Sequence, residues 1–175
     1  MRCLIIGRTS EDAEECKAYG LAPHGAARST IYWNNYERFD GDLITCHTIK
    51  YGAKWAVSVD TSKRTEDSAR MNPGRIVVGT SALHHNISPL LFENAVVLHH
   101  GPDMRYPDRD TGEFALWFAW KEGYDEIYTV GIDMLNNKEK VARVAGMIRM
   151  MEGVQVYKAN EHSSLPVPIK EPPTV

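Results

Sequence analysis

The chain has 175 residues, a formal net charge of −3 and 43% hydrophobic residues. This length is typical of one domain with a full hydrophobic core, and 25% charged residues is ordinary for a globular protein in water. The slightly acidic balance argues against general attraction to nucleic acid or to a membrane surface. Cys3, Cys16 and Cys46 are odd in number and lack metal-ligand spacing, which favours reduced thiols in a cytoplasmic protein.

Short apolar runs rich in β-branched residues alternate with helix-like segments. The predicted strands cover Arg2–Ile6, Asp42–Cys46, Lys54–Val59, Arg75–Val78, Ala95–His99, Glu126–Val130 and Val154–Tyr157. The predicted helices cover Ser10–Ala18, Ser62–Met71, Gly112–Glu122 and Asn137–Glu152. Strands that are apolar throughout are typical of a sheet covered on both faces. The alternation therefore predicts a three-layer, Rossmann-like α/β domain with a mostly parallel sheet, whose strand order the sequence does not reveal.

The sequence divides into one domain over residues 1–160 and a proline-rich tail over residues 161–175, which is expected to be extended or partly disordered. The stretch Gly20–Asn35 has neither helical nor strand periodicity and is predicted to be a loop. The opening "MRCLIIG" is too short an apolar run for a signal peptide or a membrane span.

The ends of the first three strands carry candidate ligand-binding residues, because open parallel sheets bind ligands at the carboxyl ends of their strands. Gly7, Arg8 and Thr9 follow the first strand and lead into a helix, an arrangement that could hold an anion or be an ordinary tight turn. It matches neither a Walker loop nor a dinucleotide fingerprint. His47 follows the second strand and could contact a base or sugar, or be a surface histidine.

The remaining strand ends offer further polar candidates. Asp60 and Thr61 follow the third strand and could contact a ligand or cap the next helix. His99 and His100 end the fifth strand, and adjacent strand residues point to opposite faces, so the two make a poor metal pair. One of them could act as an acid or base, or be structural. We predict no metal site.

The segment "GEFALWFAWKEG" is apolar around most of a helical circumference. Its aromatic side chains are predicted to pack on the sheet, with an aromatic ligand box as the alternative. These side chains are Phe114, Trp117, Phe118 and Trp120. The charges at Lys63-Arg64 and at 138–140 are interpreted as solvated helix faces.

The stretch "TGEFALWFAWKEGYDEIYTVGIDM" resembles the bacterial sialyltransferases of glycosyltransferase family 42. It also resembles a related group of motility-accessory and hydroxymethylpterin pyrophosphokinase-like proteins. In that group a Ser/Thr-Gly pair opens a helix, and the chain continues Gly-Tyr-x-x-Ile-Tyr-x-x-Gly-Ile-Asp. The matching residues are Thr111, Gly112, Gly123, Tyr124, Ile127, Tyr128, Gly131, Ile132 and Asp133. Weaker similarities lie at "LIIGRTS", "ITCHT", "VSVDTS" and "VQVYKANEHSSLPVP".

The resemblance implies a site for a nucleotide or nucleotide-sugar, with no resident cofactor. The implied ligand-binding residues are Gly7, Arg8, Thr9, His47, Asp60, Thr61, Thr111, Gly112 and Gly131. Removal of a proton from the acceptor would fall to His99, His100 or Asp133. Thr111 is predicted to cap the helix that follows it. The sialyltransferases carry a long lid after the Gly-Ile-Asp strand, and here neither that lid nor its catalytic histidine is matched.

Three functions remain open on this evidence. The first is metal-independent glycosyl transfer of the sialyl type. The second is a non-catalytic binding or interaction protein that kept the fold and lost the lid. The third is Mg²⁺-dependent pyrophosphoryl transfer, which would need carboxylates from Asp103, Asp108, Asp110 and Asp133. The expected partner is a small nucleotide or nucleotide-sugar, not nucleic acid or membrane, and a homo-oligomer stays open.

Overall fold

A computed structural model describes residues 1–7, 13–20, 36–59, 62–80, 89–99, 111–132, 137–161 and 163–175. The strands are β1 (Arg2–Ile6), β2 (Asp42–Cys46), β3 (Trp55–Ser58), β4 (Ile76–Thr80), β5 (Val96–His99), β6 (Glu126–Val130) and β7 (Gln155–Lys158). The helices are α1 (Ala13–Ala18), α3 (Lys63–Met71), α4 (Pro89–Asn94), α5 (Thr111–Lys121) and α6 (Lys138–Met150). Every predicted strand and helix overlaps one of these, and α4 is a helix that the sequence pattern did not predict.

The strands form a single seven-stranded sheet with the order β5-β4-β3-β2-β1-β6-β7. Every neighbouring pair is parallel, which confirms the predicted α/β fold class. From β1 the chain adds β2 to β5 outward in one direction, and it then crosses back to place β6 on the other side of β1. The strand order therefore reverses between β1 and β6, which is the topological switch point of the sheet.

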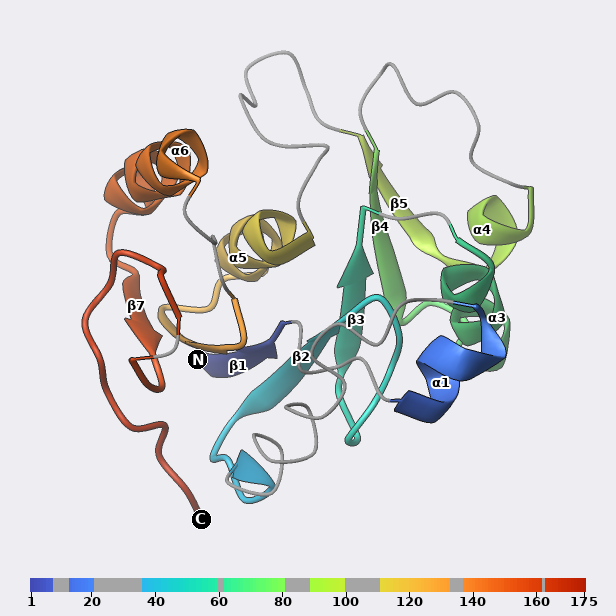
Figure 1. The fold of residues 1–175 in the computed structure, drawn as a ribbon, viewed down its shortest axis with the longest axis horizontal. Helices are drawn as coiled ribbons and strands as arrows, with labels where there is room; N and C mark the ends of the chain where they lie inside the picture. The colour runs from blue at the N-terminus through green and yellow to red at the C-terminus, as the bar shows by residue number, and fades with distance from the viewer. Residues whose placement is uncertain are drawn as a thin grey trace.

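Helices cover both faces of the sheet (Figure 1). α5 and α6 lie on one face, where the largest group of buried apolar side chains joins them to β1, β2 and β3. α3 and α4 lie on the opposite face, over a smaller apolar cluster that includes Ile76, Val78 and Leu91. The three-layer arrangement follows from strands that are apolar on both sides, because each face needs a cover.

The apolar circumference of α5 is explained by its surroundings. Phe114 and Phe118 are almost fully buried, and Phe118 meets Trp55 of β3 edge to face, with ring centroids 5.6 Å apart. Gly79 of β4 lies under Phe114, and a Cβ at that position would be 2.7 Å from the ring. The predicted packing of these aromatic side chains on the sheet is confirmed, since a helix that is apolar nearly all round must be buried nearly all round.

The C-terminal segment over residues 163–175 is extended and packs on the domain. Leu165 is fully buried, Lys158 and Ile169 form a parallel bridge, and Phe39 and Thr174 form an antiparallel one. In Figure 1 the segment runs past the outer edge of β7 to the end of the sheet where β1 and β2 begin.

All three cysteines are buried and none forms a disulfide, as predicted for core thiols. Burial raises the pKa of the Cys3 thiol far above its ordinary value, and the nearby Asp42 carboxylate adds to this effect. Within the described ranges, no helix combines the length and the apolar character that crossing a membrane requires.

Candidate functional site

The carboxyl ends of all seven strands lie at one edge of the sheet because every strand pair is parallel. Gly7 follows β1, His47 follows β2 and Gly131 follows β6, so these three predicted residues share that edge. The fourth residue expected there, Asp60, lies outside the described residues. β1, β2 and β6 are also immediate neighbours, so the edge brings these three strand ends together at the switch point.

Gly7 and Gly131 pack directly against each other at the switch point. The Gly7 N–H donates a hydrogen bond of 2.8 Å to the Val130 carbonyl. A Cβ on Gly7 would lie 2.7 Å from the Gly131 carbonyl oxygen and 3.0 Å from Cγ1 of Ile132. Gly131 has a φ of 71°, which a residue with a side chain rarely adopts. The glycine at position 7 thus has a packing role, in addition to the ligand approach or tight turn that the sequence suggested.

His47 is held in a left-handed turn directly after β2, with a φ of 69°. Its N–H donates to the Val57 carbonyl at 2.9 Å, and its Nδ1 lies 3.2 Å from the Ser58 hydroxyl. The Thr45 hydroxyl closes the same turn by donating to the Thr48 carbonyl at 2.7 Å. The imidazole ring is therefore held near the end of β3. The positive backbone φ is uncommon for a residue with a side chain and costs conformational energy.

The first turn of α5 lies at the same edge, beside the end of β3. The Val59 N–H donates to the Thr111 hydroxyl at 3.4 Å. The helix begins at Thr111 itself, so Thr111 is the first helical residue and not the predicted cap before it. Gly112 lies in this first turn and is partly exposed. The first N–H groups of a helix have no intrahelical partner, which makes this turn suited to an anion.

A buried ion pair holds the start of α5 against α6. Glu113 is fully buried, and Arg143 donates to its two carboxylate oxygens at 2.6 and 3.1 Å. Burial raises the pKa of Glu113, while the Arg143 guanidinium opposes that rise. Sequence analysis did not identify this pair, although a lone acid within an otherwise apolar helix is a signal that could have prompted a search for a cation.

A second cluster of largely buried polar side chains lies between α1, α3 and the loop after β2. Lys50 Nζ is 2.9 Å from the Glu15 carboxylate, and the Thr48 hydroxyl donates to the same group at 3.4 Å. Arg64 places its guanidinium 3.9 Å from Glu15, and its side chain is 6% exposed. The interpretation of Arg64 as part of a solvated face is therefore wrong. Its position in the first turn of α3 turns it toward α1 instead of toward solvent.

The topology places one of the predicted catalytic residues, His99, away from the switch point. His99 ends β5 at the far side of the sheet, four strand positions from β1, which corresponds to about 19 Å at the usual strand spacing. This distance places His99 away from the switch point. Five more predicted site residues lie outside the described residues: Arg8, Thr9, Thr61, His100 and Asp133.

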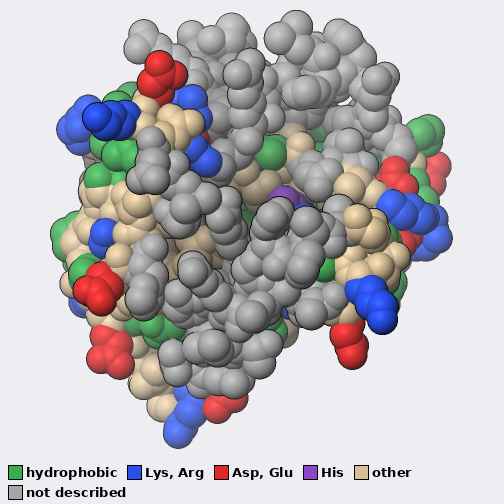
Figure 2. Space-filling model, in the orientation of Figure 1, with side chains coloured by type: hydrophobic (Ala, Val, Ile, Leu, Met, Phe, Trp, Pro, Cys, Tyr) green, Lys and Arg blue, Asp and Glu red, His purple; other side chains and the backbone are tan. Residues whose placement is uncertain are grey.

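On the face shown in Figure 2, the described basic and acidic side chains are interspersed and form no single-sign field. In the part of the chain that the structure describes, no three His, Cys, Asp or Glu side chains group as metal ligands would. No protein-family model, no curated protein and no solved structure matches this chain.

Proposed function

We propose that the carboxyl edge between the β1–β6 switch point and the start of α5 binds a nucleotide or nucleotide-sugar. The observation that carries this proposal is the reversal of strand order between β1 and β6. In open α/β sheets, such a reversal separates the loops of neighbouring strands and leaves a crevice that ligands occupy. The resemblance at residues 111–134 supports the same ligand class, because three of the residues that match its pattern, Thr111, Gly112 and Gly131, fall on this edge.

The phosphate groups of the ligand belong at the first turn of α5. The free N–H groups of that turn and the positive end of the helix dipole favour an anion. Gly112 lies there without a side chain, so a phosphate can approach the backbone. The Thr111 hydroxyl accepts a hydrogen bond from Val59, which leaves its own proton to be donated.

Metal-independent glycosyl transfer is the reaction that we favour for this site. Its general base must lie beside the ligand, and of the three candidates Asp133 is the one that follows the switch-point strand within three residues of Val130. His99 is the least suited, because its strand is at the opposite side of the sheet from β6.

A non-catalytic binding protein is the second candidate, and a feature of the chain favours it. Only residues 131–137 separate the end of β6 from the start of α6, so no long lid can follow the Gly-Ile-Asp sequence as it does in the sialyltransferases. Under this alternative the same edge binds the same class of ligand without turnover. Mg²⁺-dependent pyrophosphoryl transfer is the third candidate, and its four candidate carboxylates lie outside the described residues.

A binding experiment on two glycine variants tests the proposal. The wild-type protein is first screened by thermal shift against pyrimidine nucleotides, their sugar conjugates, and purine triphosphates with and without Mg²⁺. A ligand at one hundred times its Kd should add about 2.7 kcal/mol of stability. Gly112→Ala should then weaken the binding of the best ligand at least tenfold, measured by calorimetry, because the methyl group occupies the approach path to the first turn of α5.

Gly146→Ala is the matched control. Gly146 is also a helical glycine, but it lies in α6, and its added Cβ would meet only a flexible Arg149 nitrogen at 3.8 Å. It should raise stability by about 0.5–1 kcal/mol through helix propensity and leave affinity unchanged. Equal affinity in both variants would place the ligand elsewhere. Silence of the whole screen would reject the nucleotide proposal, and binding without turnover would favour the second candidate.

A further inference from the structure

Two neighbouring serines near the C-terminus have different environments. Ser163 is 5% exposed, whereas Ser164 is exposed. The Ser163 hydroxyl donates a hydrogen bond to the Ile132 carbonyl and accepts one from the Leu165 N–H at 3.2 Å. A serine hydroxyl has a single proton, and here that proton is committed to the main chain that leaves β6.

Ser163 is itself held in place by its surroundings. Lys158, the last residue of β7, donates from Nζ to the Ser163 carbonyl at 2.8 Å. The main chain of Lys158 also bonds to this segment twice, to the Pro168 carbonyl and from the Lys170 N–H, both at 3.0 Å. Leu165 is fully buried in the core beneath α5 and α6. The position of Ser163 is thus set by the hydrogen bond from Lys158 and by the burial of the adjacent Leu165, independently of its own bond to Ile132.

The residue that Ser163 holds is part of the switch point. Ile132 is 3% exposed, and its Cγ1 is 3.0 Å from the place where a Cβ on Gly7 would lie. It directly follows Gly131, whose φ of 71° turns the chain at the end of β6. Ser163, Ile132 and Gly7 therefore form a continuous series of contacts from the C-terminal segment to the end of β1.

We propose that Ser163 is a positioning residue for the ligand edge: it fixes the Ile132 carbonyl, and with it the course of the chain after β6, so that the crevice at the β1–β6 switch point keeps its shape. It acts through the backbone and does not touch the ligand. The consequence for ligand affinity rests on the proposed nucleotide function, whereas the consequence for the shape of the switch point does not.

Comparison of Ser163→Ala with Ser164→Ala tests this role. In two-dimensional ¹H–¹⁵N NMR spectra without ligand, Ser163→Ala should shift the amide signals of Gly7, Gly131 and Ile132. Ser164→Ala should shift only the signals of its own neighbours. Affinity for the nucleotide found in the screen should fall about three- to tenfold in Ser163→Ala, as expected for a residue coupled to a site that it does not touch, and stay within about twofold in Ser164→Ala.

Two further variants make the result decisive. Ser163→Thr keeps the hydroxyl and should restore both the wild-type signals and the affinity. Lys158→Met loosens Ser163 without altering it, and it should shift the same three signals by a smaller amount even if Ser163→Ala does not fold. Unchanged signals at Gly7, Gly131 and Ile132 in Ser163→Ala would overturn the inference, as would a loss of affinity that is larger in Ser164→Ala. If the wild-type protein binds no nucleotide, the proposed function fails, and the NMR signals still decide whether Ser163 sets the switch point.

Discussion

The face of the sheet opposite α5 and α6 is covered in two different ways. Over β3 and β4 the cover is helical, and α3 and α4 enclose a small cluster of aliphatic side chains that includes Ala69, Ile76 and Leu91. Over β1 and β6 the described residues of the cover are the turn at residues 36–39 and the extended C-terminal segment, whose Lys170 lies over the Tyr128 ring, and the buried side chains include Tyr128 and Phe39. Among the described residues, the cover is thus helical over one half of this face, whereas over the other half, the extended half, it includes an extended segment that pairs with a turn.

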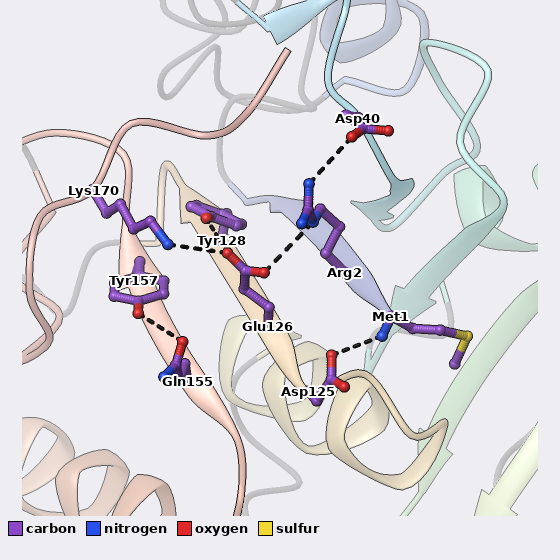
Figure 3. A network of polar contacts seen from close by, with 9 residues as sticks. All are labelled: Met1, Arg2, Asp40, Asp125, Glu126, Tyr128, Gln155, Tyr157 and Lys170. Atoms are coloured by element: carbon purple, nitrogen blue, oxygen red, sulfur yellow. Dashed lines mark hydrogen bonds and ion pairs between the residues drawn. The ribbon is translucent and has the colours of Figure 1, made fainter. Parts of the chain in front are cut away.

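The extended half depends on polar and aromatic contacts, which Figure 3 shows together. Glu126 lies 3.1 Å from Lys170 and 3.5 Å from Arg2, and it accepts a hydrogen bond from the Tyr128 hydroxyl. The Lys170 ammonium lies 4.5 Å from the centre of the Tyr157 ring and 5.5 Å from that of Tyr128. These contacts draw the tail, β6, β7 and the start of β1 into one network.

The two covers differ in how their backbone N–H and C=O groups find hydrogen-bond partners. A helix satisfies its own N–H and C=O groups and can present a purely apolar stripe to the sheet. An extended segment must find external partners, and here the N–H of Asp40 donates to Pro173 at 2.9 Å and that of Val175 to Arg38 at 2.8 Å. The extended half therefore needs specific pairing, whereas the helical half depends mainly on buried area. This contrast leads to predictions about stability.

The largest effect should come from the helical half. Leu91→Ala removes a fully buried side chain from α4 and should lower the free energy of unfolding by about 2–5 kcal/mol, measured by urea denaturation. Met71→Ala on α3 is the control, because Met71 is 81% exposed and its truncation should cost less than about 0.5 kcal/mol. A cost below about 1 kcal/mol for Leu91→Ala would mean that the aliphatic cluster is not the main source of stability in the helical half.

A smaller effect is expected from the aromatic pairing of the extended half. Phe39 meets Tyr128 edge to face, with ring centroids 5.9 Å apart and an interplanar angle of 67°. Phe39→Leu keeps most of the apolar volume but removes the ring geometry, so it should cost about 1 kcal/mol. Phe39→Tyr, which keeps the ring of this nearly buried residue, serves as the comparison. A leucine variant as stable as wild type would show that this half, too, depends only on its buried apolar surface area.

The sequence predicted the strands of the sheet better than the segments that cover them, for a physical reason. Continuous apolar runs and helical periodicity reflect burial that repeats along one segment, so β1, β2 and β6 were predicted with their observed bounds. The cover formed by residues 36–39 and the tail depends on pairing between segments that are far apart in the sequence, which leaves no period. α4 was missed because six residues are too few to show one.

The candidate site shows the same limit. Its edge could be predicted because the carboxyl ends of parallel strands coincide whatever their order. The partners of its residues could not, because they depend on strand order and on helix contacts. The packing of Gly7 on Gly131 requires β1 beside β6, and the burial of Glu113 requires Arg143 of α6. Arg64 was misjudged for the same reason, since only the position of α1 shows that its side chain is covered.

The smallest predicted effect is a dependence on pH that only the extended half should show. The hydrogen bond from the Tyr128 hydroxyl, followed by the Lys170 ammonium, lowers the pKa of Glu126 below its ordinary value of 4.5. A carboxylate whose folded-state pKa is lowered contributes stability above its unfolded-state pKa, and that contribution is lost as pH falls through the folded-state pKa. Glu126→Gln should therefore cost at most about 1 kcal/mol at pH 7, since solvent screens a partly exposed pair.

The cost of the same substitution should fall as pH drops toward the lowered folded-state pKa of Glu126, because the wild-type carboxyl then becomes protonated itself. Urea denaturation of wild type and variant at pH 7, 5 and 3.5 measures this convergence. Leu91→Ala should show the same loss at all three values because Leu91 belongs to a cluster of aliphatic side chains without a titrating group. Glu161→Gln, at an exposed acid outside the network, should show no loss at any of them. If the cost of Glu126→Gln stays constant down to pH 3.5, the charge of Glu126 does not help to hold the extended cover, and shape alone would explain both halves of the face.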